Sequence, residues 1–527
     1  MTTDLIERAR PSTLSLSPRA PAALGDGLRR HWPWVGLVCV TLMGAAIRLQ
    51  GLSSLGVWRD DAWAVMSSRV GLGTAWHMWA TAPGFYFAER SVISLHPGVT
   101  WWAQLLPLIA GIAGIPAAFA LARYFGFGPK LSLGVALLVS ISPTCAIYSV
   151  RLKEYSTDFL LACLILALGE AARRRPDSRP LCVLTVVSVA GFAVSASTLP
   201  VIAGVWLALG VHVLRSREGF GRLAVSGAAL AVGCLGVAAA LYRHISPALH
   251  TFWRANYMSH RSPAAFVSSA HDVALSLYGA MLGLSVRFPL EGALVFVVVT
   301  GLLVLGARQL KAMASPALVL GGAVVACALG AIPLGTGRTD EVLYPAILLL
   351  LAAGLREARR TVTRLLSPSA ARRVAAWTFG AATVGTFVVI GATVNVAYPG
   401  TDTRGLAQQL DHNRQSGDRI VVNELMRYPW ALYEDTPLHL EFGPAWSAGF
   451  TVISTRPGVF IAPSEFYEGG SRPGAWVAAL AGPNRVWFVE SQPLSWSPFY
   501  AAMRADGWHA VRTLHAAGCA AILFERS

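Results

Sequence analysis

The sequence predicts a polytopic α-helical membrane protein with an extracytoplasmic α/β domain at its C-terminus. Hydrophobic residues make up 54% of the 527 positions and charged residues only 13%, whereas a typical soluble protein has about 25% charged residues. Several apolar runs reach the length of about 20 residues that a helix needs to cross a bilayer. From residue 399 onward, short apolar and alternating runs lie between polar turns, which is typical of strands and amphipathic helices.

The chain begins with residues 1–32, which are polar and contain Pro, Ser and Arg. This composition indicates a disordered tail rather than a cleaved signal peptide. A membrane domain is expected over residues 33–398. Its apolar runs predict about eleven spans, at 33–50, 101–122, 131–150, 156–171, 181–198, 200–214, 223–242, 291–309, 316–334, 341–355 and 374–397.

Basic residues gather in alternate connections between these spans, for example at Arg173 and Arg174 and at Arg359 and Arg360. Because cytoplasmic loops of membrane proteins are basic, this pattern places the N-terminus in the cytoplasm and residues 399–527 outside it. We therefore expect a multi-pass protein of the cell membrane, in contact with membrane lipids. The same pattern accounts for the formal net charge of +15, so nucleic acid is not an expected partner.

Three further segments complete the expected architecture. Residues 51–100 form a long first loop on the outer side, and residues 273–290 fit an interfacial or re-entrant helix because they mix aromatic and apolar side chains. In the last domain, residues 401–423 predict an amphipathic helix, a Gly-Asp turn and a strand. The sequences "NRVWFVES" and "CAAILFERS" predict two more strands of the α/β domain.

Charged residues on the predicted outer side cluster near span ends, where ionisable groups are costly and tend to be functional. They form three groups: Asp60 and Asp61; Arg151, Lys153 and Glu154; and Arg338, Asp340 and Glu341. One alternative is that these are solvated loop charges or interfacial anchors. For the aspartate pair, another alternative is a cap on a helix that begins at Ala62.

Four stretches around these groups carry a family resemblance. They are "WRDDAW" at 58–63, the stretch 95–126 that begins with "LHPG", "ISPTCAIYSVRLKEYSTDFLLA" at 141–162 and "PLGTGRTDEVLYPAILLLLAAGL" at 333–355. In this order they resemble motifs of the GT-C superfamily of membrane glycosyltransferases. The likeness is closest to the family of protein O-mannosyltransferases and lipid A aminoarabinose transferases, and it covers most of residues 33–400.

Three positions depart from the pattern of that family. Asp61 stands where Glu is usual, Gly98 stands where a second Pro is common, and Lys153 stands where Arg is usual. A lysine keeps the positive charge but cannot hold a phosphate with a planar fork of donors. These departures suggest a subfamily with its own donor or acceptor.

The resemblance implies a hexosyl- or pentosyltransferase that uses a polyprenyl-phosphate-linked sugar as donor. The acceptor would be a hydroxyl of an envelope glycan, glycolipid or protein on the outer face of the membrane. Such a reaction needs a base for the acceptor proton and cations for the phosphate leaving group. We assign the base to Asp60. Since neighbouring helical residues point about 100° apart, Asp61 is expected to pair with Arg59, hold the acceptor or help to place a metal.

Lys153 and Arg338 are the expected ligands of the donor phosphate, and the hydroxyl of Tyr155 is a further candidate. His96 and Glu154 are weaker candidates for binding the acceptor or a metal. No cofactor is certain: the cysteines and the histidines of residues 243–272 match no standard metal pattern. A divalent metal at the acidic pair therefore stays open.

A lipid-linked-sugar transporter or a polysaccharide polymerase is the main alternative function, since both have many spans and arginines on the outer side. Such proteins more typically carry charges within the spans, along a pathway. A non-catalytic scaffold whose C-terminal domain binds cell-wall components is a second alternative.

Overall fold

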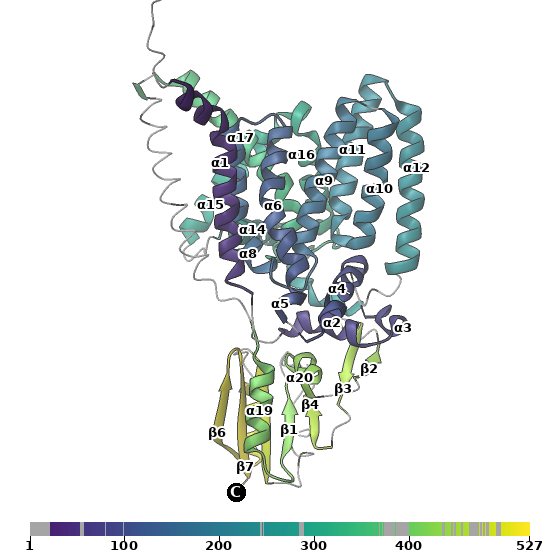
Figure 1. Ribbon diagram of the computed structural model, residues 1–527, viewed down its shortest axis with the longest axis vertical. Coiled ribbons are helices and arrows are strands. Elements are labelled where there is room, and N and C mark those ends of the chain that lie inside the picture. Colours follow the sequence, from purple (N-terminus) through teal and green to yellow (C-terminus); the bar gives the residue numbers. More distant parts are fainter. Residues whose placement is uncertain are drawn as a thin grey trace, which may run out of the picture.

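The computed structural model consists of a bundle of long helices, a thin layer of short helices at one end of the bundle, and a sheet domain beyond that layer (Figure 1). It describes residues 22–526 except 53–56, 79–80, 99, 176, 243–244, 246, 284–288, most of 368–399, 435–437, 444–445, 447–448, 455–456, most of 463–483, and 492–496.

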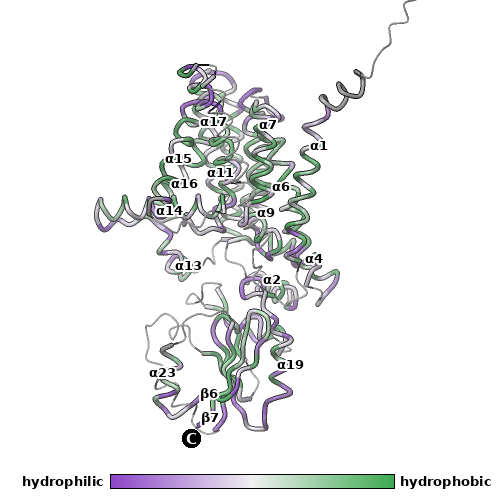
Figure 2. The backbone as a smooth tube through the Cα atoms, turned by 90° about the vertical axis from the view of Figure 1, so that its left-hand side faces the viewer, coloured by the Kyte–Doolittle hydropathy of each residue, from purple (hydrophilic) through white to green (hydrophobic). Residues whose placement is uncertain are grey.

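Each predicted span that lies within the described residues overlaps a long helix, but the limits differ. The long helices are α1 (Ala22–Leu49), α6 (Leu105–Tyr124), α7 (Pro129–Ile141), α9 (Tyr155–Arg174), α10 (Ser178–Val194), α11 (Leu199–Ser216), α12 (Phe220–Val237), α15 (Pro289–Ala307), α16 (Leu310–Ala328) and α17 (Tyr344–Leu365). Hydrophobic residues dominate along them (Figure 2). α1 begins at Ala22, so the last part of the tail expected over residues 1–32 is helical. The predicted span at 374–397 lies outside the described residues, so the number of spans stays a prediction.

Length and composition alone identify five helical stretches within the described residues that could cross a membrane. Four shorter helices, α7, α10 and most of α15 and α16, are also apolar. The fold is therefore a helical membrane fold, as the composition predicts.

The predicted span at 131–150 is broken in the structure. Because a proline has no N–H, Pro143 cannot continue the hydrogen bonding of α7. A short helix, α8 (Pro143–Tyr148), starts there, and the backbone N–H of Cys145 donates to Oγ of Ser142 at its start. The chain then enters a buried loop, residues 149–154, that ends at α9.

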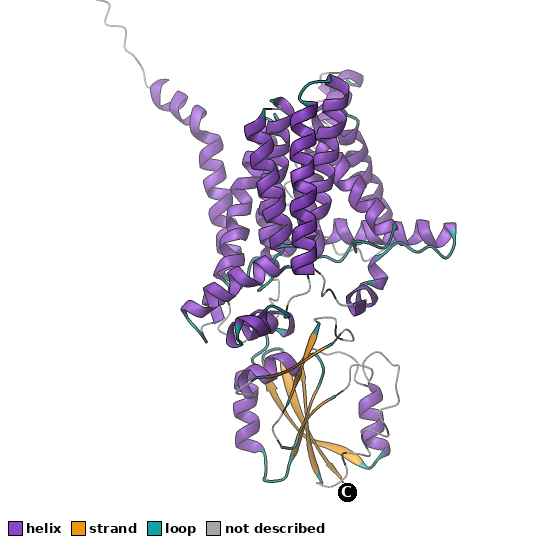
Figure 3. Cartoon of the chain, turned by 90° about the vertical axis from the view of Figure 1, so that its right-hand side faces the viewer, coloured by secondary structure: helices purple, strands orange, loops and turns teal. Residues whose placement is uncertain are grey.

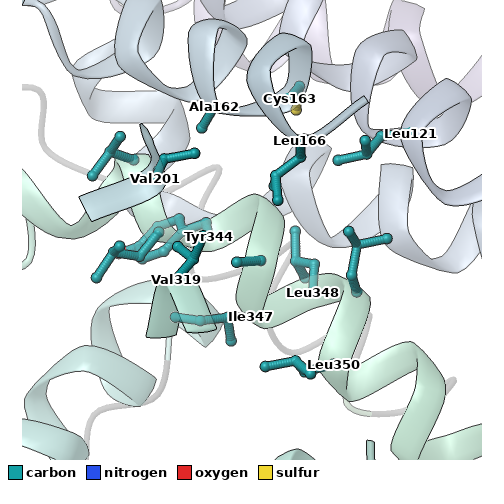
Figure 4. Close-up of a cluster of buried hydrophobic side chains, with 14 of the residues drawn as sticks. Leu121, Ala162, Cys163, Leu166, Val201, Val319, Tyr344, Ile347, Leu348 and Leu350 are labelled. Carbon is teal, nitrogen blue, oxygen red and sulfur yellow. The ribbon is translucent and has the colours of Figure 1, made fainter. Parts of the chain in front are cut away.

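The bundle is closed by side chains from helices that are far apart in the sequence. Leu121 of α6, Leu166 of α9, Val201 of α11, Val319 of α16 and Leu348 of α17 are all buried in one cluster (Figure 4). In a bilayer such side chains stabilise the bundle by close van der Waals packing rather than by removal from water, because lipid tails are as apolar as the side chains themselves. This core fixes the ends of α8, α9 and α17, and those ends carry the charged loops.

The layer beside the bundle comes mainly from the predicted first loop. It contains α2 (Arg59–Arg69), α3 (Leu72–Ala75), α4 (Pro83–Leu95) and α5 (Thr100–Ala103). Beyond α12, which continues through the π-helical turn η2 (Ala238–Tyr242), the later connection adds α13 (Pro247–Phe252), η3 (Arg254–Asn256) and α14 (Pro263–Leu282). In Figure 2, α14 runs across the direction of the long helices. This orientation agrees with the interfacial helix that the sequence predicts for part of this segment.

The C-terminal domain is α/β, as the sequence predicts. Its elements are α19 (Thr403–Asn413), β1 (Arg419–Val422), α20 (Arg427–Glu434), β2 (His439–Phe442), β3 (Phe450–Ile453), β4 (Val459–Ile461), β5 (Arg485–Ser491), α23 (Ser497–Ala505), β6 (Trp508–Ala516) and β7 (Cys519–Arg526). The predicted helix, turn and strand at 401–423 are α19 and β1, and the other two predicted strands are β5 and β7.

Five strands form one sheet in the order β4-β1-β5-β7-β6, with helices packed beside it (Figure 3). β1 is parallel to both of its neighbours, whereas β7 is antiparallel to β5 and β6. β2 and β3 form a separate antiparallel pair. α20 follows β1 and packs against α2, so the carboxyl end of β1 is turned toward the layer of short helices.

Candidate active site

A cavity of about 650 Å³ lies where the bundle, the layer of short helices and the C-terminal domain meet. This volume is in the usual range for small-molecule sites. The charged side chains in its wall are Arg59, Asp60, Lys153, Glu154 and Arg338, and the hydroxyl groups there include those of Tyr86 and Tyr155. Much of the remaining wall is apolar and comes from α13 and the segment 331–334. The cavity thus combines a charged cluster with an apolar surface.

Asp60 lies in the first turn of α2 and lines the cavity. Its Oδ2 accepts a hydrogen bond from Nη1 of Arg338 at 3.1 Å, and its Oδ1 lies 4.0 Å from Nε of Arg59. The helix begins at Arg59, and the residue that precedes it, Trp58, makes no side-chain cap. The capping interpretation of the aspartate pair therefore does not describe this helix.

Asp61 faces different partners from Asp60, as a step of one helical residue requires. Its Oδ2 lies 3.3 Å from Nη2 of Arg151, and its Oδ1 accepts a hydrogen bond from the backbone N–H of Leu152 at 3.0 Å. Both side chains of the Asp61–Arg151 pair are almost fully buried. The expected pairing of Asp61 with Arg59 is wrong, because Arg59 points toward Asp60 and Glu424 instead.

The loop 149–154 brings a second set of charges to the cavity. It lies against α6, where a Cβ on Gly111 would come within 2.2 Å of the Cβ of Ser149, so only glycine permits this approach. Nζ of Lys153 donates a hydrogen bond to the hydroxyl of Tyr86 at 2.7 Å and lies 4.5 Å from the ring centroid of Trp63. Lys153 is thus held in one orientation at the cavity wall.

Glu154 and Tyr155 follow Lys153 and also line the cavity. Both are buried, and the ring of Tyr155 contacts the ring of Tyr148 edge to face at 4.9 Å. Burial raises the pKa of Glu154 in spite of the neighbouring Lys153. The structure therefore brings these two candidates to the same place as Asp60.

A tight loop at 335–340 presents Arg338. The carboxylate of Asp340 accepts hydrogen bonds from the backbone N–H groups of Gly335 and Gly337, at 3.1 and 3.0 Å. Both glycines have positive φ, 72° and 71°, which other residues rarely adopt. On the other side, the guanidinium of Arg338 lies 4.5 Å from the ring centroid of Trp253. The guanidinium of Arg338 thus lies between this ring and Asp60.

The pKa values of Asp60 and Asp61 are shifted in opposite directions. Burial by itself disfavours the charged form of Asp60, but four nearby cations lower the pKa of Asp60 below its ordinary value. These cations, from the strongest effect, are Lys153, Arg338, Arg59 and Arg151. For Asp61, burial outweighs the attraction of Arg151 and raises its pKa. Asp60 is thus the more firmly ionised carboxylate.

Two sequence candidates, Asp61 and His96, are not among the residues that line the cavity. Asp61 is buried in its pair with Arg151, whereas His96 is exposed. His96 lies at the end of α4, where its ring contacts that of Trp102 at 4.4 Å. Among the described residues, no three His, Cys, Asp or Glu side chains are close enough together to hold a metal ion.

Several residues of the site had no sequence signal. Tyr86 accepts a hydrogen bond from Lys153, and the ring of Trp253 packs against Arg338. Glu424 and Leu425 come from the C-terminal domain. Of the site residues that were not assigned a role from the sequence, only Arg151 could have been selected, because it belongs to the second group of charges. The arrangement as a whole can bind an anion between Lys153 and Arg338 beside an ionised carboxylate.

Comparison with solved structures identifies the fold. ArnT from Cupriavidus metallidurans matches in the apo state with a TM-score of 0.50 and 15% identity, over 95% of this chain and 98% of that one. ArnT bound to undecaprenyl phosphate matches with a TM-score of 0.51 and 16% identity, over 93% of this chain and 98% of that one.

The Archaeoglobus fulgidus oligosaccharyltransferase in complex with Zn and sulfate gives a TM-score of 0.46 and 12% identity, over 92% of this chain and 72% of that one. No protein-family model matches the sequence, and no curated protein matches it. The chain has the fold of the GT-C glycosyltransferases, as its motifs predict.

Proposed function

We propose that the protein is a glycosyltransferase that moves a sugar from a polyprenyl-phosphate donor to an acceptor hydroxyl on the outer face of the membrane. The observation that carries this proposal is the cluster of Asp60, Lys153 and Arg338 in the wall of a cavity that is otherwise largely apolar. A polyprenyl phosphate has the same two parts, an anion and an apolar chain. The GT-C fold and the undecaprenyl phosphate bound to ArnT support the choice of donor.

The charged cluster fits each requirement of this reaction. The acceptor oxygen forms a bond to the anomeric carbon, and the bond from that carbon to the phosphate oxygen breaks. Lys153 and Arg338 stabilise the negative charge that develops on the phosphate. Asp60 takes the proton of the acceptor hydroxyl, which a low pKa permits because the carboxylate is ionised before the reaction begins.

Arg338 couples donor binding to the strength of the base. It donates a hydrogen bond to Asp60, and a donor phosphate would compete for the same guanidinium. When Arg338 turns to the phosphate, Asp60 loses a stabilising cation, and its affinity for a proton increases. The base thus becomes stronger when the donor is in place.

Transfer can be tested directly with purified protein. Mass spectrometry of co-purifying lipids identifies the polyprenol and sugar, and the matching polyprenyl-phosphate sugar is then supplied with candidate acceptors. We expect release of polyprenyl phosphate together with a glycosylated product, both lost in Asp60→Asn. Absence of transfer from every lipid-linked donor that binds the protein would contradict the proposed reaction.

The outer-face location rests on the basic residues of alternate loops. A reporter that is active only in the cytoplasm, fused after Ser527, should be silent, and a periplasmic or extracellular reporter at the same position should be active. Strong cytoplasmic activity would reverse the sidedness of the cavity and remove the reason for a lipid-borne donor.

A further inference from the structure

The C-terminal domain contacts the charged cluster through the turn 423–426, which connects β1 to α20. Oε1 of Glu424 lies 3.5 Å from Nη2 of Arg59 and 3.2 Å from Nη2 of Arg427. The Glu424 side chain is only 13% exposed, so solvent screens these two ion pairs weakly. The next residue, Leu425, lines the cavity. This turn is therefore part of the cavity wall.

The position of the turn in the sheet makes it a suitable place for a functional residue. β1 lies between β4 and β5, and both are parallel to it. After β1 the chain adds β4 on one side of β1 and later β5 on its other side. Open α/β sheets bind ligands beyond the carboxyl ends of the strands at the place where the chain changes sides in this way. Here the carboxyl end of β1 leads straight into Glu424.

The turn is held firmly. The backbone N–H of Asn423 donates to the carbonyl of Val489 at 2.9 Å, and Oδ1 of Asn423 accepts from the backbone N–H of Met426 at 2.8 Å. The Glu424 carboxylate thus has a fixed position relative to the sheet.

A second contact joins the domain to the same site. Trp63 of α2 lies edge-on to the rings of Tyr428 and Phe450, with ring centroids 5.6 and 6.3 Å apart. Nζ of Lys153 lies over the ring of Trp63. The C-terminal domain therefore supports α2 beside both Asp60 and Lys153.

We propose that Glu424 is a positioning residue of the transferase site and that the C-terminal domain thereby forms one wall of it. This inference rests on the proposed function. Arg59 lies between two carboxylates, Glu424 and Asp60. Glu424 attracts one end of the guanidinium and so limits its approach to the base.

Loss of Glu424 would free Arg59 to close on Asp60. A closer ion pair occupies the oxygen atoms of Asp60 and lowers their affinity for the acceptor proton. Turnover should then fall, whereas donor binding should persist because Lys153 and Arg338 hold the phosphate. Glu424 acts through Arg59, so its effect must depend on that residue.

A double-mutant cycle with Glu424→Gln and Arg59→Gln tests this dependence. Glu424→Gln should lower kcat about tenfold, a typical size of coupling between charged neighbours, and leave KM for the donor within about twofold. In the Arg59→Gln background, the same change should have little further effect. Glu424→Asp keeps the charge and should therefore retain part of the kcat that Glu424→Gln loses. The control is Glu441→Gln on β2, where Glu441 is exposed, and it should behave as the wild type.

Thermal unfolding of the same variants provides a readout without substrate. Glu424→Gln should lower the thermal midpoint in the wild type more than in the Arg59→Gln background. Equal losses of kcat in both backgrounds would overturn the inference alone, because Glu424 would then act only by attaching the domain. A wild-type protein that transfers no sugar overturns the proposed function and the positioning role together.

Discussion

Arg338 donates a hydrogen bond to Asp60 across 278 positions of sequence, and this contact joins the first and the third of the three charged groups near the span ends. The ring of Trp253 packs on the other side of the guanidinium and restricts its movement. A cation and a base that touch in this way influence each other: whatever draws Arg338 away also makes Asp60 a better proton acceptor. The contact therefore predicts distinct consequences for changes at the two aspartates.

Asp60→Asn should lower turnover by about a hundredfold or more, because an amide cannot accept the proton of the acceptor hydroxyl. Donor binding should survive, since cations on other loops hold the phosphate. Measurement of kcat and of polyprenyl-phosphate binding on the same preparation separates the two effects. Full activity of this variant would mean that the pair is structural.

Asp61→Asn should act mainly on stability. The change leaves Arg151 buried without its carboxylate partner, and removal of one member of a buried ion pair costs about 3–5 kcal/mol. The thermal midpoint should fall, while kcat of the remaining folded protein should fall less than in Asp60→Asn. A stable Asp61→Asn protein without activity, beside an active Asp60→Asn protein, would exchange the two roles.

Much of the fold could be predicted because hydropathy over about 20 residues depends on the local sequence alone. The residues at which the helices begin and end were harder to predict from the sequence. α1 begins at Ala22 rather than near residue 33, since polar residues also form helix, and the span at 131–150 is divided by Pro143. The strands β5 and β7 were predictable because both are short apolar runs between polar turns.

The site was predictable as three groups of charges but not as a set of contacts. Arg59 is adjacent to the aspartates in sequence, yet Asp61 pairs with Arg151, because packing of α2 against the loop 149–154 decides the partner. The contribution of Glu424 depends on how the C-terminal domain docks. Pairings across such separations follow from tertiary packing, which a single sequence does not encode in any local pattern.

Lys153→Ala should weaken donor binding, with KM for the donor raised about thirtyfold or more, because the loss of one buried partner of a charged ligand costs about 2–5 kcal/mol. Lys153→Arg should be the mildest change, since it keeps the charge. The matched control is Lys130→Ala at the start of α7, far from the cavity wall. Unchanged donor kinetics in Lys153→Ala would remove this lysine from the phosphate site.

Glu89 of α4 is a buried carboxyl group, and neither of its oxygens has a hydrogen-bond partner among the described residues. Burial, and next the charge of Asp61, raise the pKa of Glu89 to about 9. The folded protein therefore keeps the proton of Glu89 at neutral pH, whereas the unfolded chain releases it near the ordinary value of 4.5.

The raised pKa of Glu89 predicts a dependence of stability on pH. Because the pKa of Glu89 is higher in the folded protein than in the unfolded chain, its contribution to the free energy of unfolding is complete below about pH 4.5. This contribution is lost as the pH rises toward about 9, the pKa of Glu89 in the folded protein. The loss amounts to at most about 1.4 kcal/mol per pH unit. Glu89→Gln removes this proton linkage, so its thermal midpoint should exceed that of the wild type increasingly between about pH 5 and about pH 8. Glu441→Gln, on the exposed side of β2, is the control. Parallel pH profiles for the wild type and Glu89→Gln would show that Glu89 is already ionised in the folded protein.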